Sequence, residues 1–326
     1  MSKIDYTIFY KRKINDLRYL KKVQYDLFIS AYNDSFRVKE VFNLINATEK
    51  HWLMLPEYDY TQLEFPSHPF IYQFSTNNIE SEIIRKYFDD LIENGFFNKK
   101  VCIDITGFMR QYIVFLVRYL SQRRIKIVDF LYSDPEIYVK SENTSFSDIF
   151  LDVKQITGCE GIHNPETYND LLIIGAGYDS KRISDVAKNK ANAKKVLLFG
   201  FPSLQPDMFQ QNILNAYKAE ESSHTGEFDF LDSNNSVLAP ANDPFITAQL
   251  ISDYIKKENK KNEFTNIYLC PLSTKAQTLG FALYYVYEGI NEPISIIFPY
   301  FKKYTRETTK GFTKAWIYTV ELEFAL

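Results

Sequence analysis

The hydrophobic and polar positions along the chain predict strands that alternate with helices. Short, uninterrupted apolar runs at residues 27–30, 52–55 and 101–105 are typical of strands buried on both faces of a parallel sheet. The segment 79–95 instead carries apolar residues at helical spacing. Because strands and helices alternate over most of the chain, the pattern predicts parallel sheets with right-handed crossovers.

The predicted elements form two series. The first series also has helices at 34–45 and 108–123, a strand at 125–132 and β-type alternation over 138–156. The second series has strands at 171–174, 196–199, 267–270 and 294–298, helices beginning near residues 180, 243 and 273, and closing strands up to residue 324. Each series therefore ends in predicted antiparallel strands.

The two series repeat one module. Residues 25–41 align with 169–186 when one residue is inserted, and this places the pattern Asp34-Ser35-x-Arg37 on Asp179-Ser180-x-Arg182. Later matches keep the same order: Gln111, Phe115, Tyr138, Phe146, Phe150 and Ile156 fall on Gln277, Phe281, Tyr304, Phe312, Trp316 and Leu322. A duplication of this kind predicts two pseudo-symmetric halves with a ligand cleft where they meet.

The expected fold is α/β, with two tandem Rossmann-like modules whose sheets are mainly parallel and end in antiparallel strands. An N-terminal arm would occupy residues 1–20, the first module 21–160 and the second module 161–326. The second module carries an insertion at about 204–238, which is polar and rich in turn residues. Such a stretch predicts an excursion loop or a lid over one half.

Charge gives little reason to expect a nucleic-acid partner. The chain has 326 residues, enough for two domains with their own cores, and a net charge of -3. Direct nucleic-acid binding is therefore not expected. The Lys and Arg residues of segment 11–22 alternate with apolar residues, a pattern that favours a packing arm over a nucleic-acid clamp.

Cysteine, histidine and hydropathy patterns predict a reduced cytoplasmic protein. Cys102, Cys159 and Cys270 are scattered and form no CxxC pair. The N-terminus lacks the apolar core of a signal peptide, and no run of about 18 apolar residues predicts a membrane span. The four histidines have no metal-binding spacing, so neither a metal site nor a cofactor is expected.

The candidate ligand-binding residues lie beyond the carboxyl ends of the predicted strands, where open parallel sheets bind their ligands. They are Ser30, Tyr32, Asn33 and Asp34 with Thr106, Gly107 and Arg110 in the first half, and Gly175, Gly177, Tyr178 and Asp179 with Ser273, Thr274 and Lys275 in the second. The loops ending at Arg110 and Lys275 combine hydroxyl residues with a cation at a helix N-terminus, an arrangement that favours an anion.

Structural roles are the alternative for several of these residues. Thr106 and Ser273 would then only cap their helices. Asp34 would pair with Arg37, and Asp179 with Arg182. The run Gly175-x-Gly177-x-x-Ser180 also invites a dinucleotide-binding interpretation, but its third position is Ser and no ribose-binding acid follows the next strand. A NAD dehydrogenase is thereby excluded, and room for a tight turn explains the two glycines.

One of these loops resembles a known signature. Residues 103–110 (Ile-Asp-Ile-Thr-Gly-Phe-Met-Arg) resemble the Asp-x-Thr-Gly-Gly-Thr-Lys motif of CARF domains, and residues 271–275 are similar to it at Thr274-Lys275. The chain departs from the motif at Phe108-Met109, where Gly-Thr is usual. The resemblance implies a Rossmann-like sensor of cyclic oligoadenylates in prokaryotic antiviral defence, with a β-hairpin after each core. Such sensors usually carry a fused effector, and no residues remain here for one, so a protein effector partner is expected.

Three hypotheses about function follow. The leading one is a nucleotide-binding sensor that holds a small adenine-nucleotide messenger between the halves, with Tyr32 and Tyr178 stacking on bases, and relays binding to the effector. A second is an enzyme of the ring-nuclease or glycosidase type in the same cleft, with Asp34, Asp104 or Asp179 as acid or base. A third is a non-catalytic scaffold for an effector.

Overall fold

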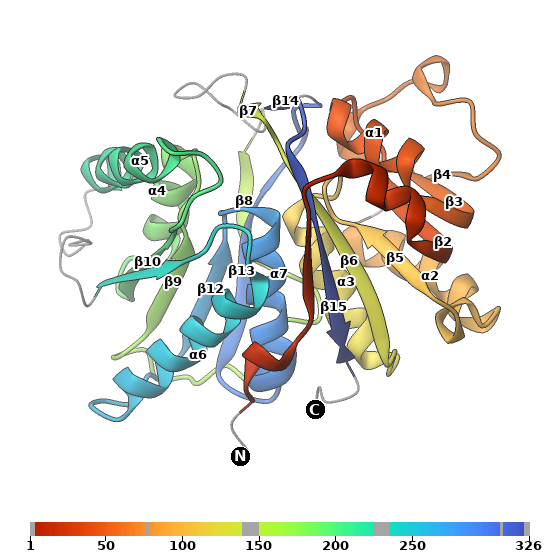
Figure 1. Ribbon diagram of the computed structural model, residues 1–326. Coiled ribbons are helices and arrows are strands. Elements are labelled where there is room, and N and C mark those ends of the chain that lie inside the picture. The colour runs from red at the N-terminus through yellow and green to blue at the C-terminus, as the bar shows by residue number, and fades with distance from the viewer. Residues whose placement is uncertain (1–3, 76–78, 139–149, 224–234, 307–308, 323–326) are drawn as a thin grey trace.

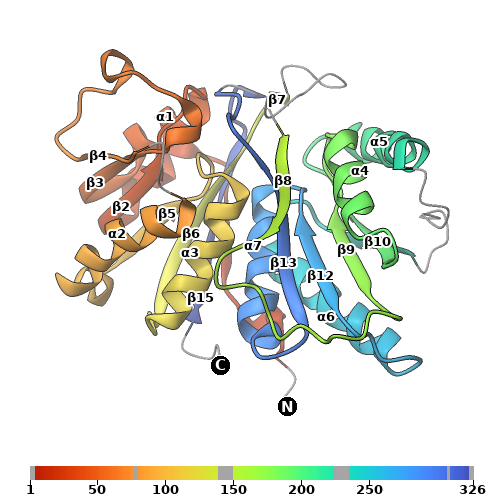
Figure 2. The ribbon, with the colours of Figure 1, turned by 180° about the vertical axis from the view of Figure 1, so that it is seen from behind.

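The computed structural model describes residues 4–75, 79–138, 150–223, 235–306 and 309–322. They form a mixed α/β structure with two mostly parallel sheets flanked by helices (Figures 1 and 2). The parts of the predicted tail and insertion at residues 139–149 and 224–234 lie outside the described residues, as do the ends of the chain.

The first sheet has seven strands. Its order is β1 (Lys11–Ile14), β15 (Lys314–Glu321), β6 (Ile127–Asp134), β5 (Val101–Asp104), β2 (Gln24–Ala31), β3 (Asn46–Met54) and β4 (Ile71–Gln73). The strands from β6 to β4 are parallel, whereas β15 and β1 run antiparallel to their neighbours. The parallel strands that the apolar runs predicted are confirmed, with β2, β3 and β5 in the expected places.

The second sheet has six strands. Its order is β11 (Ser236–Ala239), β10 (Lys194–Gly200), β9 (Leu171–Gly175), β12 (Ile267–Pro271), β13 (Ile294–Phe301) and β8 (Phe150–Gln155). The strands are parallel except β8, which is antiparallel to β13. The order β4-β3-β2-β5-β6 of the first sheet thus recurs as β11-β10-β9-β12-β13 in the second.

The α-helices lie on both faces of the sheets. They are α1 (Phe36–Leu44), α2 (Glu80–Glu93), α3 (Arg110–Gln122), α4 (Ser180–Asn189), α5 (Met208–Ser223), α6 (Pro244–Asn259) and α7 (Lys275–Tyr284), which continues as a π-helix at Tyr285–Gly289. Helices α2 and α3 cover the face of the first sheet opposite α1 (Figures 1 and 2). Where the two halves meet, α3 packs against α7.

Helix α5 corrects the prediction of an excursion loop at 204–238. Met208, Asn212, Ala216 and Ala219 are buried and follow one another every three or four residues, so they form one face of a helix that packs against α4. Polar and turn-forming residues surround this face, so the helical spacing of the buried residues was not recognised in the sequence.

The terminal strands of the two halves are exchanged. Strand β8 follows the first half in sequence but pairs with β13 of the second sheet, and β15 follows the second half but pairs with β6 of the first sheet. The short strands β7 (Ile137–Tyr138) and β14 (Thr309–Lys310) pair antiparallel near the crossing (Figure 1). Antiparallel terminal strands were predicted, but their exchange was not.

The N-terminal segment contacts both halves. Its first 3₁₀ helix, Tyr6–Ile8, packs on α6, and the ring of Phe9 stacks on that of Phe245 with centroids 5.3 Å apart. Strand β1 then joins the first sheet, and the apolar residues Ile14 and Leu20 of the basic stretch are buried, as a packing arm requires. Other 3₁₀ helices span Leu17–Lys22, Pro56–Tyr58, Gln62–Glu64 and Phe96–Asn98.

Candidate functional site

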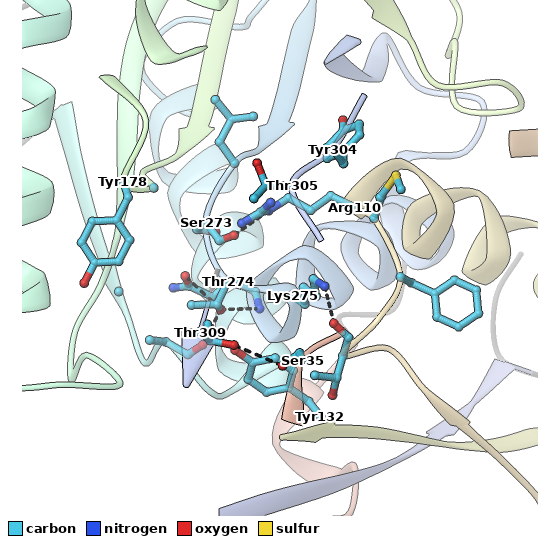
Figure 3. A pocket seen from close by; sticks show the side chains of 18 of the residues that line it. Ser35, Arg110, Tyr132, Tyr178, Ser273, Thr274, Lys275, Tyr304, Thr305 and Thr309 are labelled. Atoms are coloured by element: carbon cyan, nitrogen blue, oxygen red, sulfur yellow. Dashed lines mark hydrogen bonds between the residues drawn. The ribbon is translucent and has the colours of Figure 1, made fainter. Parts of the chain in front are cut away.

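A cleft lies between the two sheets at the carboxyl ends of their parallel strands. It encloses about 1000 Å³ of empty space, its open mouth included. The loops after β2, β5, β9 and β12 line it, together with Met208 and Asn212 of α5 and residues around β14. Figure 3 shows side chains from these loops, among them Arg110, Tyr178 and Lys275. This is the place where the sheet topology and the duplication predicted a ligand site.

The structure divides the fourteen sequence-predicted site residues into two groups. Eight of them line the cleft: Asn33, Thr106, Arg110, Gly177, Tyr178, Ser273, Thr274 and Lys275. The other six, Ser30, Tyr32, Asp34, Gly107, Gly175 and Asp179, are absent from its lining. Each of these six contacts neighbouring residues of its own half.

Neighbouring groups explain why the polar and aromatic members of the second group face elsewhere. Ser30 is fully buried and donates a hydrogen bond of 3.1 Å to Asp104. The ring of Tyr32, predicted to stack on a base, instead packs edge-on against Trp52, with ring centroids 5.2 Å apart. Asp34 binds Lys39 at 3.1 Å.

The glycines allow two loops in each half to approach closely. A Cβ atom on Gly107 would lie 1.8 Å from the carbonyl oxygen of Ala31, and one on Gly177 would lie 2.3 Å from that of Leu272. At Gly175 a Cβ would lie 2.6 Å from the hydroxyl oxygen of Ser273. None of the three has a positive φ, so close approach and not a left-handed turn requires glycine here.

Two cations reach across from one half to the other. Arg110 and Lys275 are the first residues of α3 and α7, respectively. The Nε of Arg110 donates to the carbonyl oxygen of Ser273 at 2.7 Å, and the Nζ of Lys275 donates to the carbonyl oxygen of Thr106 (Figure 3). Each cation therefore binds the loop that precedes the other helix.

The cleft is strongly cationic. Arg37, Arg110, Lys275 and Arg306 line it, and no carboxylate is among its described lining residues, although the whole chain has a net charge of -3. Of the four, Arg306 is paired with Glu64 at 2.5 Å. Burial, together with the positive charges of Arg37 and Arg110, holds the pKa of Lys275 well below its ordinary value. Three like charges close enough to lower a lysine pKa create a potential that favours an anion.

Several buried polar atoms of the cleft have no hydrogen-bond partner. They are the Nε of Arg37, the Oγ of Ser273 and the Oδ1 of Asn212, on side chains at most 6 % exposed. Buried polar groups are almost always hydrogen-bonded in folded proteins, and orphaned ones cost about 1–3 kcal/mol each. Three such atoms around one cleft are expected of a site where a polar ligand supplies the missing hydrogen bonds.

The capping alternative for Thr106 and Ser273 is wrong. The N-cap of α3 is Met109, and that of α7 is Thr274, whose hydroxyl accepts from the backbone N–H of Gln277 at 3.2 Å. The hydroxyl of Thr106 is instead within 3.1 Å of that of Ser133 at the end of β6. Helix α3 thus begins without a side-chain cap, whereas α7 supplies its own.

The pairing predicted for the two Asp-Ser-x-Arg patterns is right in one half and wrong in the other. Asp179 pairs with Arg182 at 3.0 Å, as predicted. Arg37 is buried and donates instead to the carbonyl oxygen of Ser133, because Asp34 is held by Lys39 and by the Tyr60 hydroxyl. Arg37 is therefore a cleft residue that the sequence analysis treated as structural.

Other cleft residues were missed altogether. Six of them come from the strand exchange and the inserted helix: Tyr304, Thr305, Arg306 and Thr309 near β14, and Met208 and Asn212 in α5. Others, such as Tyr58 and Tyr132, come from the first half. Tyr304 aligns with Tyr138 in the repeat, which gave no hint that the segment crosses between the halves. The spacing of three or four residues between the buried positions of α5 was the signal in the sequence that would have placed Met208 and Asn212 on a helix.

The carboxylates proposed as acid or base do not line the cleft. Asp104 is fully buried, accepts hydrogen bonds from Ser30 and from the Thr106 backbone, and has a pKa raised by burial. A carboxylate that the sequence analysis did not select, Glu57, lies behind the wall and accepts from the Tyr112 hydroxyl at 2.9 Å. Burial raises the pKa of Glu57 to about 7.

The remaining chemical candidates do not line the cleft. Cys102, Cys159 and Cys270 are free and buried, and burial raises the pKa of each thiol. Within the described ranges no group of three or more His, Cys, Asp and Glu side chains is placed to hold a metal ion. Over the same residues, no helix combines the length and the apolar character that crossing a membrane requires.

Comparisons with known proteins leave the site to be interpreted from its own chemistry. No protein-family model matches the chain, and a search of curated proteins found no match.

Proposed function

We propose that the protein binds a small anionic ligand, a nucleotide, in the cleft between its halves, and that binding is relayed to a protein partner. The observation that carries the proposal is the lining itself: four basic side chains, one of which (Arg306) is paired with a carboxylate, no described carboxylate in the lining, and three unpartnered polar atoms on buried side chains. A phosphate group would supply the counter-charge and the acceptors that Arg37 and Lys275 need.

Aromatic and neutral polar residues support a nucleotide over a simple anion. Tyr58, Phe108, Tyr132, Tyr178 and Tyr304 line the cleft beside the cations. Such walls suit a ligand with a charged group and a flat, partly apolar body. The resemblance of residues 103–110 to the CARF motif favours an adenine nucleotide and, through the family, a tandem Rossmann-like sensor in antiviral defence.

The cross-half contacts suggest how binding is transmitted. Arg110 and Lys275 bind carbonyl oxygens of the opposite half. A phosphate competing for these cations would weaken the two contacts and change how α3 packs on α7. A partner that binds one of the two arrangements better than the other would then respond to the nucleotide.

A thermal-stability panel tests this proposal. The wild-type protein is melted with AMP, ADP-ribose, NAD, pyrophosphate, and linear and cyclic oligoadenylates. A ligand at about 100 times its dissociation constant should stabilise the protein by roughly 2.7 kcal/mol. The Lys275→Ala variant should lose the shift, whereas Lys302→Ala, which removes an exposed lysine outside the cleft, should keep it.

The same panel separates the competing hypotheses. Chromatography of each nucleotide after incubation with the protein reports turnover, which would favour the enzyme hypothesis. The enzyme hypothesis named Asp34, Asp104 or Asp179 as acid or base, but none of the three lines the cleft. If no nucleotide raises the melting temperature, the sensor proposal is wrong, and the scaffold hypothesis takes its place.

A further inference from the structure

The two halves carry equivalent arginines, but within the described residues only one of them forms an ion pair. Arg37 and Arg182 occupy the same position of the repeated Asp-Ser-x-Arg pattern, near the start of α1 and α4, and both are buried. A cleft built from two equal halves would present both arginines to a two-fold symmetric ligand. Only Arg37 lines the cleft.

Arg182 is already neutralised within its own half. Its Nε lies 3.0 Å from the Oδ2 of Asp179. Its guanidinium carbon also lies 4.4 Å from the centroid of the Phe301 ring and 5.8 Å from that of Tyr304. With a carboxylate on one side and aromatic rings on the other, Arg182 has its charge satisfied without any ligand.

Arg37 lacks such a counter-charge. It donates through Nη1 to the carbonyl oxygen of Ser133. Neither its Nε nor that of Arg182 makes a well-aligned hydrogen bond, but of the two only the Nε of Arg182 has a carboxylate at ion-pair distance. Among the residues that the structure describes, none forms an ion pair with it. Asp104 and Asp134 are close enough to interact electrostatically with Arg37, but both carboxylates accept hydrogen bonds from other donors. The guanidinium carbon of Arg37 also lies 5.8 Å from the centroid of the Tyr132 ring. Arg37 thus lines the cleft without the direct carboxylate partner that Arg182 has.

The second-half side of the cleft offers neutral groups. Tyr178, Met208 and Asn212 line it there, and the buried Oδ1 of Asn212 has no hydrogen-bond donor. Figure 3 shows Tyr178 on the opposite side of the cleft from Ser35 and Tyr132, away from the Lys275 ammonium. This side suits an uncharged group that donates a hydrogen bond, such as the exocyclic amine of a base.

We propose that the cleft binds one asymmetric nucleotide per chain. Its terminal phosphate binds Arg37 on the first-half side, assisted by Lys275, and its base lies between Tyr178 and Asn212 on the second-half side. This inference rests on the proposed function and deepens it: the ligand class is a linear nucleotide with a terminal phosphate monoester, and a two-fold symmetric cyclic dinucleotide fits less well. The two sheets are thus related by pseudo-symmetry, whereas the two sides of the binding site carry different groups.

Calorimetric titration tests the assignment with two diadenylates that differ only in the terminal group: 5′-phosphorylated pApA and unphosphorylated ApA. We expect wild-type protein to bind one pApA per chain, and ApA about 10- to 100-fold more weakly, the range for losing charge-assisted hydrogen bonds. Arg37→Gln should lose most of the preference for pApA over ApA, because only Lys275 then remains to bind the terminal phosphate. Arg37→Lys should recover part of the preference, because it restores the charge without the planar fork.

Arg182→Gln is the matched control. It removes the equivalent arginine, and its affinity for pApA should stay within about threefold of wild type because Arg182 does not line the cleft. Cyclic di-AMP, which has no terminal phosphate, should bind more weakly than pApA. Circular dichroism of each variant checks that it is folded.

The outcomes separate this inference from the proposed function. Equal losses in Arg37→Gln and Arg182→Gln, or tighter binding of cyclic di-AMP than of pApA, overturn the asymmetric site while leaving a nucleotide site in place. Absence of binding by any nucleotide in the wild type overturns the proposed function itself. If Arg37→Gln does not fold, the wild-type comparison of ApA with pApA and the Arg37→Lys variant still decide, because equal affinities there contradict a phosphate at Arg37.

Discussion

The same four-residue pattern, Asp-Ser-x-Arg, opens a helix in each half, but it forms an ion pair in one half only. In the second half Asp179 accepts from the backbone N–H of Arg182 and pairs with its guanidinium. In the first half the aspartate turns to a different cation, and Arg37 points its charge into the cleft. The repeated pattern therefore lies at the start of a helix in both halves, while individual neighbouring side chains determine whether the arginine is paired with its aspartate.

The neighbours responsible are visible in the sequence. Lys39 competes for Asp34, and the aligned position in the second half is Ser184, which leaves Asp179 to its arginine. At the end of the last parallel strand, Phe301 stacks under Arg182, whereas the aligned residue is Pro135. Two sequence differences thus separate the ion-paired Arg182 from Arg37, which lines the cleft.

The exchanged strands differ between the halves as well. Strand β15 lies inside the first sheet between β1 and β6, and its inward residues are buried. Strand β8 is the edge of the second sheet, and most of its residues are exposed. The first half therefore depends on a strand contributed from far along the chain, and the second half depends on its borrowed strand much less.

The largest expected effect comes from the buried strand. Tyr318 on β15 is fully buried and donates from its hydroxyl to the carbonyl oxygen of Asn242 at 2.5 Å. Tyr318→Ala should lower the free energy of unfolding by about 3–5 kcal/mol, through the lost aromatic volume and the cavity it leaves. Equilibrium urea denaturation measures this loss.

Val153→Ala on the edge strand β8 is the comparison for that measurement. Val153 is only half-buried, so its truncation should cost less than about 1 kcal/mol. Tyr318→Phe keeps the ring and removes one hydrogen bond, with an expected cost of about 1 kcal/mol. Similar losses for Tyr318→Ala and Val153→Ala would contradict the unequal dependence of the two halves on their exchanged strands.

A smaller effect is expected from moving Asp34 back to Arg37. The double variant Lys39→Ser, Tyr60→Phe removes both groups that hold the Asp34 carboxylate. Asp34 should then pair with Arg37, as Asp179 does with Arg182, and the affinity for pApA should fall by about tenfold, or 1.4 kcal/mol. Calorimetric titration measures the change.

Adding Asp34→Asn to that double variant supplies the control. The amide carries no charge, so the affinity should return to near the wild-type value if pairing with Arg37 caused the loss. An affinity that stays low in the triple variant would instead indicate that Lys39 or Tyr60 supports the cleft directly.

The sequence predicted the parts of the molecule that depend on local patterns. Apolar runs located β2, β5, β9 and β12, and the topology rule for parallel sheets then placed eight candidate residues in one cleft. Arg110 and Lys275 were among them because a cation at a helix start after a strand is a local signal.

The features that were missed depend on long-range choices. Nothing local in residues 150–155 or 314–321 states which sheet they join, because either edge offers an antiparallel partner with free hydrogen-bonding groups. The exchange carries Tyr304 and Arg306 over the cleft, so these residues were missed with it. Arg37 was missed for a related reason: its freedom depends on Lys39 and Tyr60 outcompeting it for one carboxylate.

The last expected effect is a pH dependence that distinguishes the free cleft from the occupied one. Burial and the charges of Arg37 and Arg110 lower the pKa of Lys275 in the free protein. A bound phosphate would raise it again, so binding takes up a proton at pH values above the lowered pKa. The affinity for pApA should therefore be constant below that pKa and fall above it, by at most tenfold per pH unit for one proton.

The stability of the free protein should change with the opposite sign. Between the lowered pKa of folded Lys275 and the ordinary lysine value, the unfolded chain binds more protons than the folded one, so the free energy of unfolding rises with pH. Lys275→Met should remove both trends, leaving weak binding that no longer depends on pH in this range. Titrations between about pH 7 and 9.5, where the terminal phosphate with its second pKa near 6 stays dianionic, avoid its own titration. Parallel profiles for wild type and Lys275→Met would mean that Lys275 does not meet the phosphate, and that Arg37 and Arg110 hold it without the cation from the second half.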